Sequence, residues 1–220
     1  FFFSSPKTIT DELGHGSVLL TPHNIPKEKR KQEEDYGKYN AGFIAFKNDQ
    51  DGRECLEWWK QKCLEWCFAD IEPDRQGDQK YLNYFQEKFN NIIVSKNKGL
   101  NLAIWNIKNY ANEITSDGQN ILVGNTKLVF FHFAKFQLYY PYSYILPNSP
   151  FDFYSIPSLA KKYIYKIYPQ YIYKITKSIN LVSPNFKYGF VYRPKIWLHI
   201  KKDIMPSIKE NIKIALKKLV

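Results

Sequence analysis

Two short polar motifs supply the side chains in this sequence that are best suited to hold a ligand. The first is Asn40-Ala41-Gly42, which leads directly into the apolar run 43–46. Ala41 and Gly42 have almost no side chain, so a ligand or another backbone can approach closely there. Asn40 offers a hydrogen-bond donor and an acceptor beside that gap. The motif therefore predicts a strand whose polar end contacts a bound molecule.

The second motif is Gly77-Asp78-Gln79, at the predicted start of a helix that continues to Phe89. A carboxylate at this place can take a proton from a reacting hydroxyl group. Alternatively, Asp78 simply caps the helix by accepting backbone hydrogen bonds, and the residues alone leave both roles open. Together the small-residue strand and the acidic helix start suggest a ligand cleft at the strand ends of an α/β layer.

Taken in order, the motifs resemble those of nucleotide-sugar glycosyltransferases of the A-type, Rossmann-like fold (the GT-A fold). The shared features are the Asn-Ala-Gly strand at 40–42, Asp78-Gln79 followed by Leu82-Asn83, and a histidine, His132, on a late strand. The opening segment 1–6 resembles the stretch that follows the Asp-x-Asp metal motif of such enzymes, although that motif is absent and the first residue is not methionine. The resemblance covers residues 1–135. It implies the C-terminal part of a catalytic domain whose Asp-x-Asp motif lies outside this chain.

The resemblance also assigns roles to the two motifs. It implies that Asn40, Ala41 and Gly42 contact the donor sugar. In an inverting enzyme Asp78 would take the proton of the acceptor hydroxyl or hold a sugar hydroxyl, with Gln79 beside it. In a retaining enzyme no base is needed there, and Gln79 would line the reacting face of the sugar. The sequence leaves the stereochemistry open, as it does the donor, the acceptor and the linkage.

His132 matches the late metal-binding histidine of these enzymes; the alternative is a core position among the neighbouring phenylalanines. The resemblance implies that its neutral imidazole completes a largely oxygen-ligated Mn²⁺ or Mg²⁺ shell, and that this metal neutralises charge on the departing diphosphate. The family's usual glycine three residues later is replaced by Lys135, which would reach the diphosphate. The resemblance further places Trp105 and Asn106 near the cleft.

Another candidate ligand contact is His23, which follows a predicted strand, Ser17–Leu20. The alternative is an exposed histidine in a loop. The next segment, 27–35, is highly charged and lacks apolar periodicity, which predicts an irregular, mobile loop. Such a loop, directly before the Asn40 strand, would suit a lid over a sugar nucleotide; a plain solvated loop is the alternative.

An amphipathic helix is predicted at Asp51–Ala69. Trp58, Trp59 and Trp66 lie on its apolar stripe, at spacings that suit a helix face packed on a sheet. A sugar-stacking platform is the alternative, and core packing is favoured. The three cysteines of the chain fall in the same segment and match no zinc pattern, so free thiols in a reducing compartment are expected.

The remaining apolar runs predict strands at 91–94 and 102–106. The runs 121–123 and 127–132, separated by a turn at 124–126, predict a terminal hairpin or paired strands. Combined with the helices, these strands give the front half a mixed α/β pattern. The expected fold class is therefore α/β, with a partial Rossmann-like GT-A domain built on a mixed sheet.

The net charge of +11 is unevenly distributed along the chain. Residues 1–135 contain equal numbers of basic and acidic residues, whereas residues 136–220 contain 14 basic residues, 3 acidic residues and 12 of the 17 tyrosines. This predicts a boundary near residue 135, followed by a basic, aromatic, helical extension with helices at 158–179, kinked at Pro169, and at 208–219. Lysines and tyrosines on such helices are typical of segments that bind an anionic membrane surface. The alternative is that the helices pack on the catalytic domain and expose their lysines to solvent.

We therefore expect a metal-assisted glycosyltransferase that moves a sugar from a nucleotide-diphosphate sugar to a glycan or lipid-linked acceptor, as in the synthesis of cell-envelope polysaccharides. No stretch is apolar enough to span a bilayer and no signal peptide is visible, which predicts a cytoplasmic protein held peripherally on the inner face of the membrane. Two other classes are open. A noncatalytic transferase-like scaffold would suit the missing Asp-x-Asp motif. A nucleic-acid-binding protein is suggested by the pI of about 9.3, but the neutral front half disfavours it.

Overall fold

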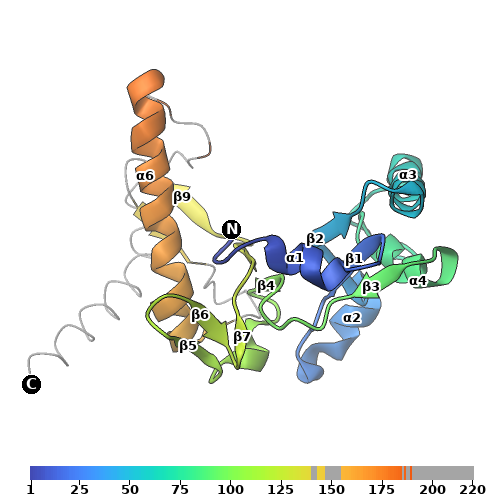
Figure 1. The fold of residues 1–220 in the computed structure, drawn as a ribbon, viewed down its shortest axis with the longest axis horizontal. Helices are drawn as coiled ribbons and strands as arrows, with labels where there is room; N and C mark the ends of the chain where they lie inside the picture. The colour runs from blue at the N-terminus through green and yellow to red at the C-terminus, as the bar shows by residue number, and fades with distance from the viewer. Residues whose placement is uncertain (140–142, 147–154, 185, 187–188, 190–220) are drawn as a thin grey trace, which may run out of the picture. The chain divides into compact units, whose positions relative to one another are not determined.

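The computed structural model describes residues 1–139, 143–146, 155–184, 186 and 189. The chain divides into two compact units, Phe1–Phe133 with Pro157–Tyr163, and Ala134–Ile156 with Ile164–Val220. Figure 1 shows the elements of both units. The helix predicted at 208–219 lies outside the described residues.

The first unit is built around a three-stranded mixed sheet in which β1 (Val18–Pro22) is the central strand. It pairs antiparallel with β2 (Tyr39–Phe46) and parallel with β3 (Ile92–Val94). The mixed α/β pattern predicted from the sequence is confirmed. Because successive side chains of a strand point to opposite faces, β1 contributes Val18 and Leu20 to one face and Leu19 to the other.

Helix α3 (Gln50–Glu65), the 3₁₀ helix η2 (Lys80–Tyr84) and the short α4 (Phe85–Lys88) contribute to the core on the Val18 face. Helix α3 begins where the Asp49 carboxylate accepts a hydrogen bond from the Gly52 N–H at 2.9 Å. It ends at Glu65, four residues before the predicted end, where the backbone of Trp66 becomes extended. Trp58 and Trp59 pack against this core, which confirms the core-packing interpretation for these two rings. Trp66 instead contacts the Arg75 guanidinium at 4.6 Å.

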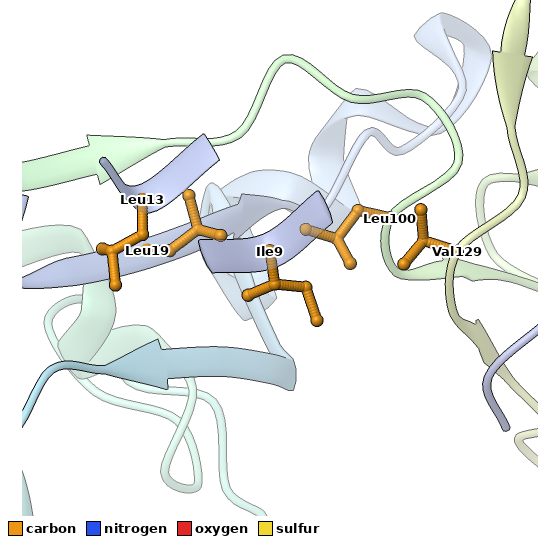
Figure 2. Close-up of a cluster of buried hydrophobic side chains, with 5 residues drawn as sticks. All are labelled: Ile9, Leu13, Leu19, Leu100 and Val129. Carbon is orange, nitrogen blue, oxygen red and sulfur yellow. The ribbon is translucent and has the colours of Figure 1, made fainter. Parts of the chain in front are cut away.

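On the other face of the sheet, helix α1 (Lys7–Leu13) covers Leu19, and this helix was missed by the sequence analysis. Its apolar side chains, Ile9 and Leu13, join Leu19, Leu100 and Val129 in one buried cluster, which Figure 2 shows from the side. Segments from three distant parts of the chain therefore meet above the central strand. Burying apolar groups in this way contributes about 25 cal/mol for each square ångström removed from water.

Beyond β3 the chain forms short strands rather than the longer ones predicted. The strand predicted at 102–106 is limited to β4 (Leu102–Ala103) and is followed by the 3₁₀ helix η3 (Ile107–Tyr110). The run predicted at 127–132 is split. Strand β7 (Thr126–Lys127) continues the antiparallel sheet of β5 (Ile114–Ser116) and β6 (Ile121–Val123), whereas β8 (Phe131–His132) pairs parallel with β4. The split occurs where the backbone N–H groups of residues 129 and 130 both bond to the Gly99 carbonyl.

The prediction of an irregular loop at 27–35 is wrong. The segment forms a 3₁₀ turn, η1 (Lys27–Lys29), and helix α2 (Arg30–Tyr36), which ends at Gly37 with a φ of 105°. Arg, Lys, Gln and Glu are good helix formers, so a short helix needs no apolar periodicity when its ends are held. The Lys108 ammonium bonds the Glu28 carboxylate at 2.7 Å and fixes the first of these ends.

The second unit contains a two-stranded antiparallel sheet, β9 (Gln137–Tyr139) with β10 (Ser143–Ile145), and helix α6 (Ile167–Val182). Helix α5 (Ser158–Ala160) and a π-helical turn, η4 (Lys161–Tyr165), precede α6 along the chain. The irregularity in this helical region lies in that turn, and Pro169 falls in the first turn of α6, where a proline costs no hydrogen bond. Among the described residues, no helix is long and apolar enough to cross a membrane.

Candidate functional site

Three buried or half-buried amide side chains from distant segments form the centre of the candidate site. Asn40 lies on β2, Gln79 lies directly before η2, and Asn101 lies directly before β4. The Asn40 Nδ2 group donates to Gln79 Oε1 at 2.7 Å, and Asn101 Nδ2 donates to Asn40 Oδ1 at 3.0 Å. The two predicted motifs are thus joined by a direct hydrogen bond across 39 residues.

Gln79 is fully engaged by its neighbours. Besides Asn40, its Oε1 accepts from the Ala41 N–H at 3.2 Å, and its Nε2 donates to the Tyr36 carbonyl at 2.9 Å. The amide therefore ties the C-terminal end of α2 to the start of β2. A side chain whose donors and acceptor are used in this way holds the site together and has little capacity left for a ligand.

Gly42 provides the close approach that the sequence predicted. A Cβ atom on Gly42 would lie 2.4 Å from His132 Nδ1, 2.5 Å from Asn40 Oδ1 and 3.0 Å from Asn101 Oδ1. These distances are shorter than a carbon atom tolerates, so a side chain at this position would displace the polar groups. The absence of a side chain brings the predicted metal ligand, His132, against the Asn40 motif although the two are far apart in sequence.

The two candidate histidines lie on either side of Trp105. The ring centroid of Trp105 is 5.1 Å from that of His132 and 5.8 Å from that of His23, edge-to-face in both pairs. His23 is only 6% exposed, so the exposed-loop alternative is wrong for it. Its Nδ1 lies 3.1 Å from the Gly37 carbonyl, in position to donate to that oxygen.

Burial favours the neutral form of both imidazoles over the charged form. The pKa of His23 is lowered by desolvation, an effect that the hydrogen bond to Gly37 opposes. The pKa of His132 is lowered chiefly by desolvation. A neutral imidazole nitrogen with a free lone pair can accept a hydrogen bond or ligate a metal ion.

Three polar atoms of this cluster are buried without a hydrogen-bond partner among the described residues: His132 Nδ1, Asn101 Oδ1 and Trp105 Nε1. Leaving such a group unpaired costs about 1–3 kcal/mol, which makes these atoms exceptional in a folded protein. They include a donor, the indole N–H, and an acceptor, the amide oxygen. A molecule that carries several hydroxyl groups would satisfy this combination.

Asn106 supports the site through the backbone. Its Oδ1 accepts from the Ala103 N–H at 2.9 Å, and its Nδ2 donates to the carbonyls of His23 at 3.2 Å and Asn101 at 3.3 Å. Only 2% of Asn106 is exposed. Of the predicted Trp105–Asn106 pair, the indole is therefore the member with an uncommitted polar atom, while the amide fixes the chain around it.

Asp78 lies beside α3. Its side chain is exposed, and its carbonyl accepts from the Trp59 indole N–H at 2.8 Å. Its charge also contributes, after burial and the charge of Cys67, to raising the pKa of Cys63 to about 11. It does not cap the helix, because η2 begins at Lys80 without a side-chain cap.

Lys135, predicted to reach the diphosphate, is exposed, has a φ of 58° and belongs to the second unit.

The sequence analysis missed Asn101 and Thr21. Asn101 is fully buried, has a φ of 58° and donates to the Thr21 hydroxyl at 2.8 Å. Thr21 in turn donates to the Phe43 carbonyl at 2.8 Å and so links β1 to β2. A polar residue between Leu100 and Leu102, in an otherwise apolar run, was the available signal, because buried amides are usually held in a network.

Comparisons with known proteins give two relatives from Bacillus subtilis (strain 168), both described as uncharacterized. The protein YfnF is 30% identical over 198 residues, which cover 86% of this chain and 62% of YfnF. The protein YfnD is 31% identical over 199 residues, which cover 87% of this chain and 60% of YfnD. The chain therefore spans about three fifths of the length of these relatives. No protein-family model matches the chain, and no solved structure matches it.

Proposed function

We propose that this chain is the C-terminal part of the catalytic domain of a GT-A glycosyltransferase that uses a nucleotide-diphosphate sugar. One observation carries the proposal. The Asn40-Ala41-Gly42 motif, Gln79 and His132 meet in one cluster, and the unpartnered His132 Nδ1 and Asn101 Oδ1 lie within 3.0 Å of the place where a Cβ of Gly42 would be. These residues come from motifs far apart in the sequence, and the resemblance implies that they share one site.

Within this proposal the donor sugar binds against Gly42. The acceptor oxygen of Asn101 and the donor nitrogen of Trp105 are the groups suited to its hydroxyls. Asn40 has both ends of its amide engaged, by Gln79 and by Asn101, so it shapes the sugar site from a fixed position. A rigid arrangement of this kind holds the reacting carbon in place at little further entropic cost.

His132 fits a metal-binding role in part. Its Nδ1 is unpartnered and its pKa is lowered, as expected for a neutral imidazole ligand of Mn²⁺ or Mg²⁺. Within the described residues no three His, Cys, Asp or Glu side chains gather as a metal site, so the oxygen ligands would come from the Asp-x-Asp motif that the resemblance places outside this chain. When bound, the metal would neutralise negative charge on the departing diphosphate.

Asp78 is proposed as the residue that receives the acceptor proton, because it is an exposed carboxylate that directly precedes Gln79 in the sequence. Its position outside the buried network leaves it accessible to an acceptor. The acceptor itself is proposed to be a glycan or a lipid-linked sugar.

The test uses the full-length protein with a panel of UDP-, GDP- and dTDP-sugars and Mn²⁺ or Mg²⁺. Binding is measured by calorimetry, and turnover by release of the nucleoside diphosphate. Asp78→Asn should abolish transfer while donor binding is retained, because a base acts only in the transition state. His132→Ala should weaken binding only when the metal is present.

The matched control is His15→Ala, since His15 is an exposed histidine of the same unit. It should leave binding and turnover unchanged. Donor binding that is the same for His132→Ala, His15→Ala and wild type would contradict the metal role. Normal turnover by Asp78→Asn would remove that residue from the reaction, and failure of every donor to bind would leave the chain as a noncatalytic scaffold.

A further inference from the structure

Helix α6 has an apolar face that is exposed to solvent, which is unusual for a helix of a globular domain. Pro169 and Thr176 are its buried residues. On the opposite side the large apolar side chains are Tyr171, Ile175, Leu181 and Val182, with exposed fractions of 50%, 51%, 86% and 88%. Tyr171, Ile175 and Val182 are spaced by four and seven residues, so they share one stripe along the helix.

The charge on this helix has one sign. Residues 164–182 contain three lysines, Lys166, Lys174 and Lys177, and no Asp or Glu. All three lysines are exposed. At 100° per residue, Lys174 lies between Leu181 and Tyr171 around the helix and borders the apolar stripe. Lys177 lies beyond Leu181, on the adjoining side of the helix.

A groove of about 660 Å³ runs along the same face. Its lining includes Tyr171, Ile175, Ile179 and Val182, with Lys174 at its edge. An apolar groove bordered by a lysine suits a molecule with a hydrocarbon part and an anionic part. Phospholipids have this combination, whereas a nucleic acid strand offers no aliphatic chain for Ile175 and Val182.

We propose that the exposed face of α6 binds the surface of a membrane that contains anionic phospholipids. Ile175, Leu181 and Val182 enter the boundary between headgroups and acyl chains, and Tyr171 lies at the headgroup level. Lys174, at the edge of the groove, contacts the lipid phosphates, and Lys177 on the adjoining side of the helix adds to the attraction of the anionic surface. The helix lies on the membrane, since no described helix is suited to cross it.

The apolar contribution is tested with Ile175→Glu and Val182→Glu together, in the full-length protein. Sedimentation is measured with vesicles of phosphatidylcholine alone and of phosphatidylcholine with phosphatidylglycerol. Wild type should bind the anionic vesicles, and the double variant should bind them at least about tenfold more weakly. The matched control is Leu64→Glu, the same change at a side chain that is 72% exposed on helix α3, and it should bind as wild type does.

The electrostatic contribution is tested with Lys174→Glu and Lys177→Glu together, against the control pair Lys96→Glu and Lys127→Glu, whose lysines are exposed in the first unit. The first pair should lose about tenfold in affinity for anionic vesicles, more than the control pair loses. Raising the salt concentration should weaken the binding of wild type to anionic vesicles, and it should reduce the difference in affinity between wild type and the Lys174→Glu, Lys177→Glu variant. Unchanged circular dichroism of each variant shows that the fold is intact.

Three results would overturn the proposal. The first is equal, salt-insensitive binding of wild type to neutral and anionic vesicles, or no binding to either. The second is equal loss of binding in the α6 variants and their controls. The third is a different occupant of the face: a dimer that Ile175→Glu and Val182→Glu dissociate, or binding to polyuridylate that depends on Lys174 and Lys177 in the absence of vesicle binding.

Discussion

Gln79 and Asn101 hold the same residue, Asn40, by the two ends of its amide, but they differ in what remains of their own hydrogen-bonding capacity. Gln79 uses its oxygen for Asn40 and Ala41 and its nitrogen for the Tyr36 carbonyl. Asn101 uses its nitrogen for Asn40 and Thr21, and its buried oxygen has no partner in the described part of the chain. The cluster therefore has a bonded side, which also includes Asn106 and His23, and an unbonded side, which also includes Trp105 and His132.

This difference separates two kinds of residue that sequence motifs group together. A change on the bonded side breaks hydrogen bonds of the folded chain, so its main cost should appear in stability. A change on the unbonded side removes an atom that the folded chain does not use, so its main cost should appear in ligand binding. The following predictions test this division, from the largest expected effect on stability to the smallest.

The largest loss of stability is expected for Asn106→Ala, a change on the bonded side of the cluster. The change leaves the Ala103 N–H and the carbonyls of His23 and Asn101 without their partner in a buried site. We expect the free energy of unfolding to fall by about 3–5 kcal/mol, measured by urea denaturation. The control is Asn109→Ala, an exposed asparagine of the same 3₁₀ helix with one bond to the Asn24 carbonyl, which should cost about 1 kcal/mol or less. Equal losses for the two variants would contradict the division.

Gly42→Ala tests the contact between the bonded and the unbonded side of the cluster. Its Cβ would lie 2.4 Å from His132 Nδ1, so the imidazole or the strand must shift. We expect a loss of about 1–3 kcal/mol in the free energy of unfolding, together with loss of donor binding. In a His132→Ala background the imidazole nitrogen nearest to the new Cβ is absent, so Gly42→Ala should lower the free energy of unfolding by less. An equal cost in both backgrounds would show that the imidazole does not limit the space.

The pH dependence of stability tests His23. Its folded-state pKa is lowered, so between that pKa and the unfolded value of about 6.5 the unfolded state binds more protons. The stability due to neutral His23 is therefore fully present above about pH 6.5 and is lost as the pH falls below it, by up to about 1.4 kcal/mol per pH unit. Urea denaturation between pH 8 and pH 5 should show a shallower loss for His23→Gln than for wild type. Parallel curves would mean that His23 does not carry this dependence.

The smallest effect on stability is expected for Trp105→Phe on the unbonded side. The change keeps an aromatic ring between the two histidines and removes the unpartnered Nε1 together with two carbon atoms of the indole. The free energy of unfolding should change by less than about 1 kcal/mol, whereas donor affinity should fall by about tenfold, as for one lost hydrogen bond in a buried site. A large loss of stability with unchanged affinity would reverse the assignment of this residue.

The elements that follow from a local pattern of apolar residues could be predicted from the sequence. The elements that depend on contacts with residues far along the chain were missed. The apolar stripe of α3 and the apolar runs of β1 and β2 can be read directly from the sequence. Helix α2 was missed because it is rich in charged residues and buries none of its side chains. Helix α1 was missed because Ile9 and Leu13 are buried by contacts with residues far along the chain, among them Val129, which the local sequence does not reveal. Strand β8 was merged with β7 because its partner, β4, lies far away in sequence.

For the candidate site, the residues with motif resemblance were predicted, but their individual roles were not. Whether an amide holds its neighbours or faces a ligand depends on which of its atoms are already bonded, and neighbours in space decide that. Gln79 and Asn106 were expected to contact substrate, and their amides are occupied by the backbone or by Asn40. Asn101 carries the uncommitted oxygen and matches no part of the motifs.

The parallel pairing of β1 with β3 has a consequence for how this protein is made. Leu20 pairs with Val94, which follows it by 74 residues, and β1 is the strand shared by both pairings of the sheet. Ribosomes add about 5–20 residues per second, so Leu20 waits about 4–15 seconds before its parallel partner is synthesised. During that time β1 can form only its hairpin-like pairing with β2, which leaves one apolar edge open. The nascent chain therefore exposes its most buried strand to other chains, or to a chaperone, until residue 94 has emerged.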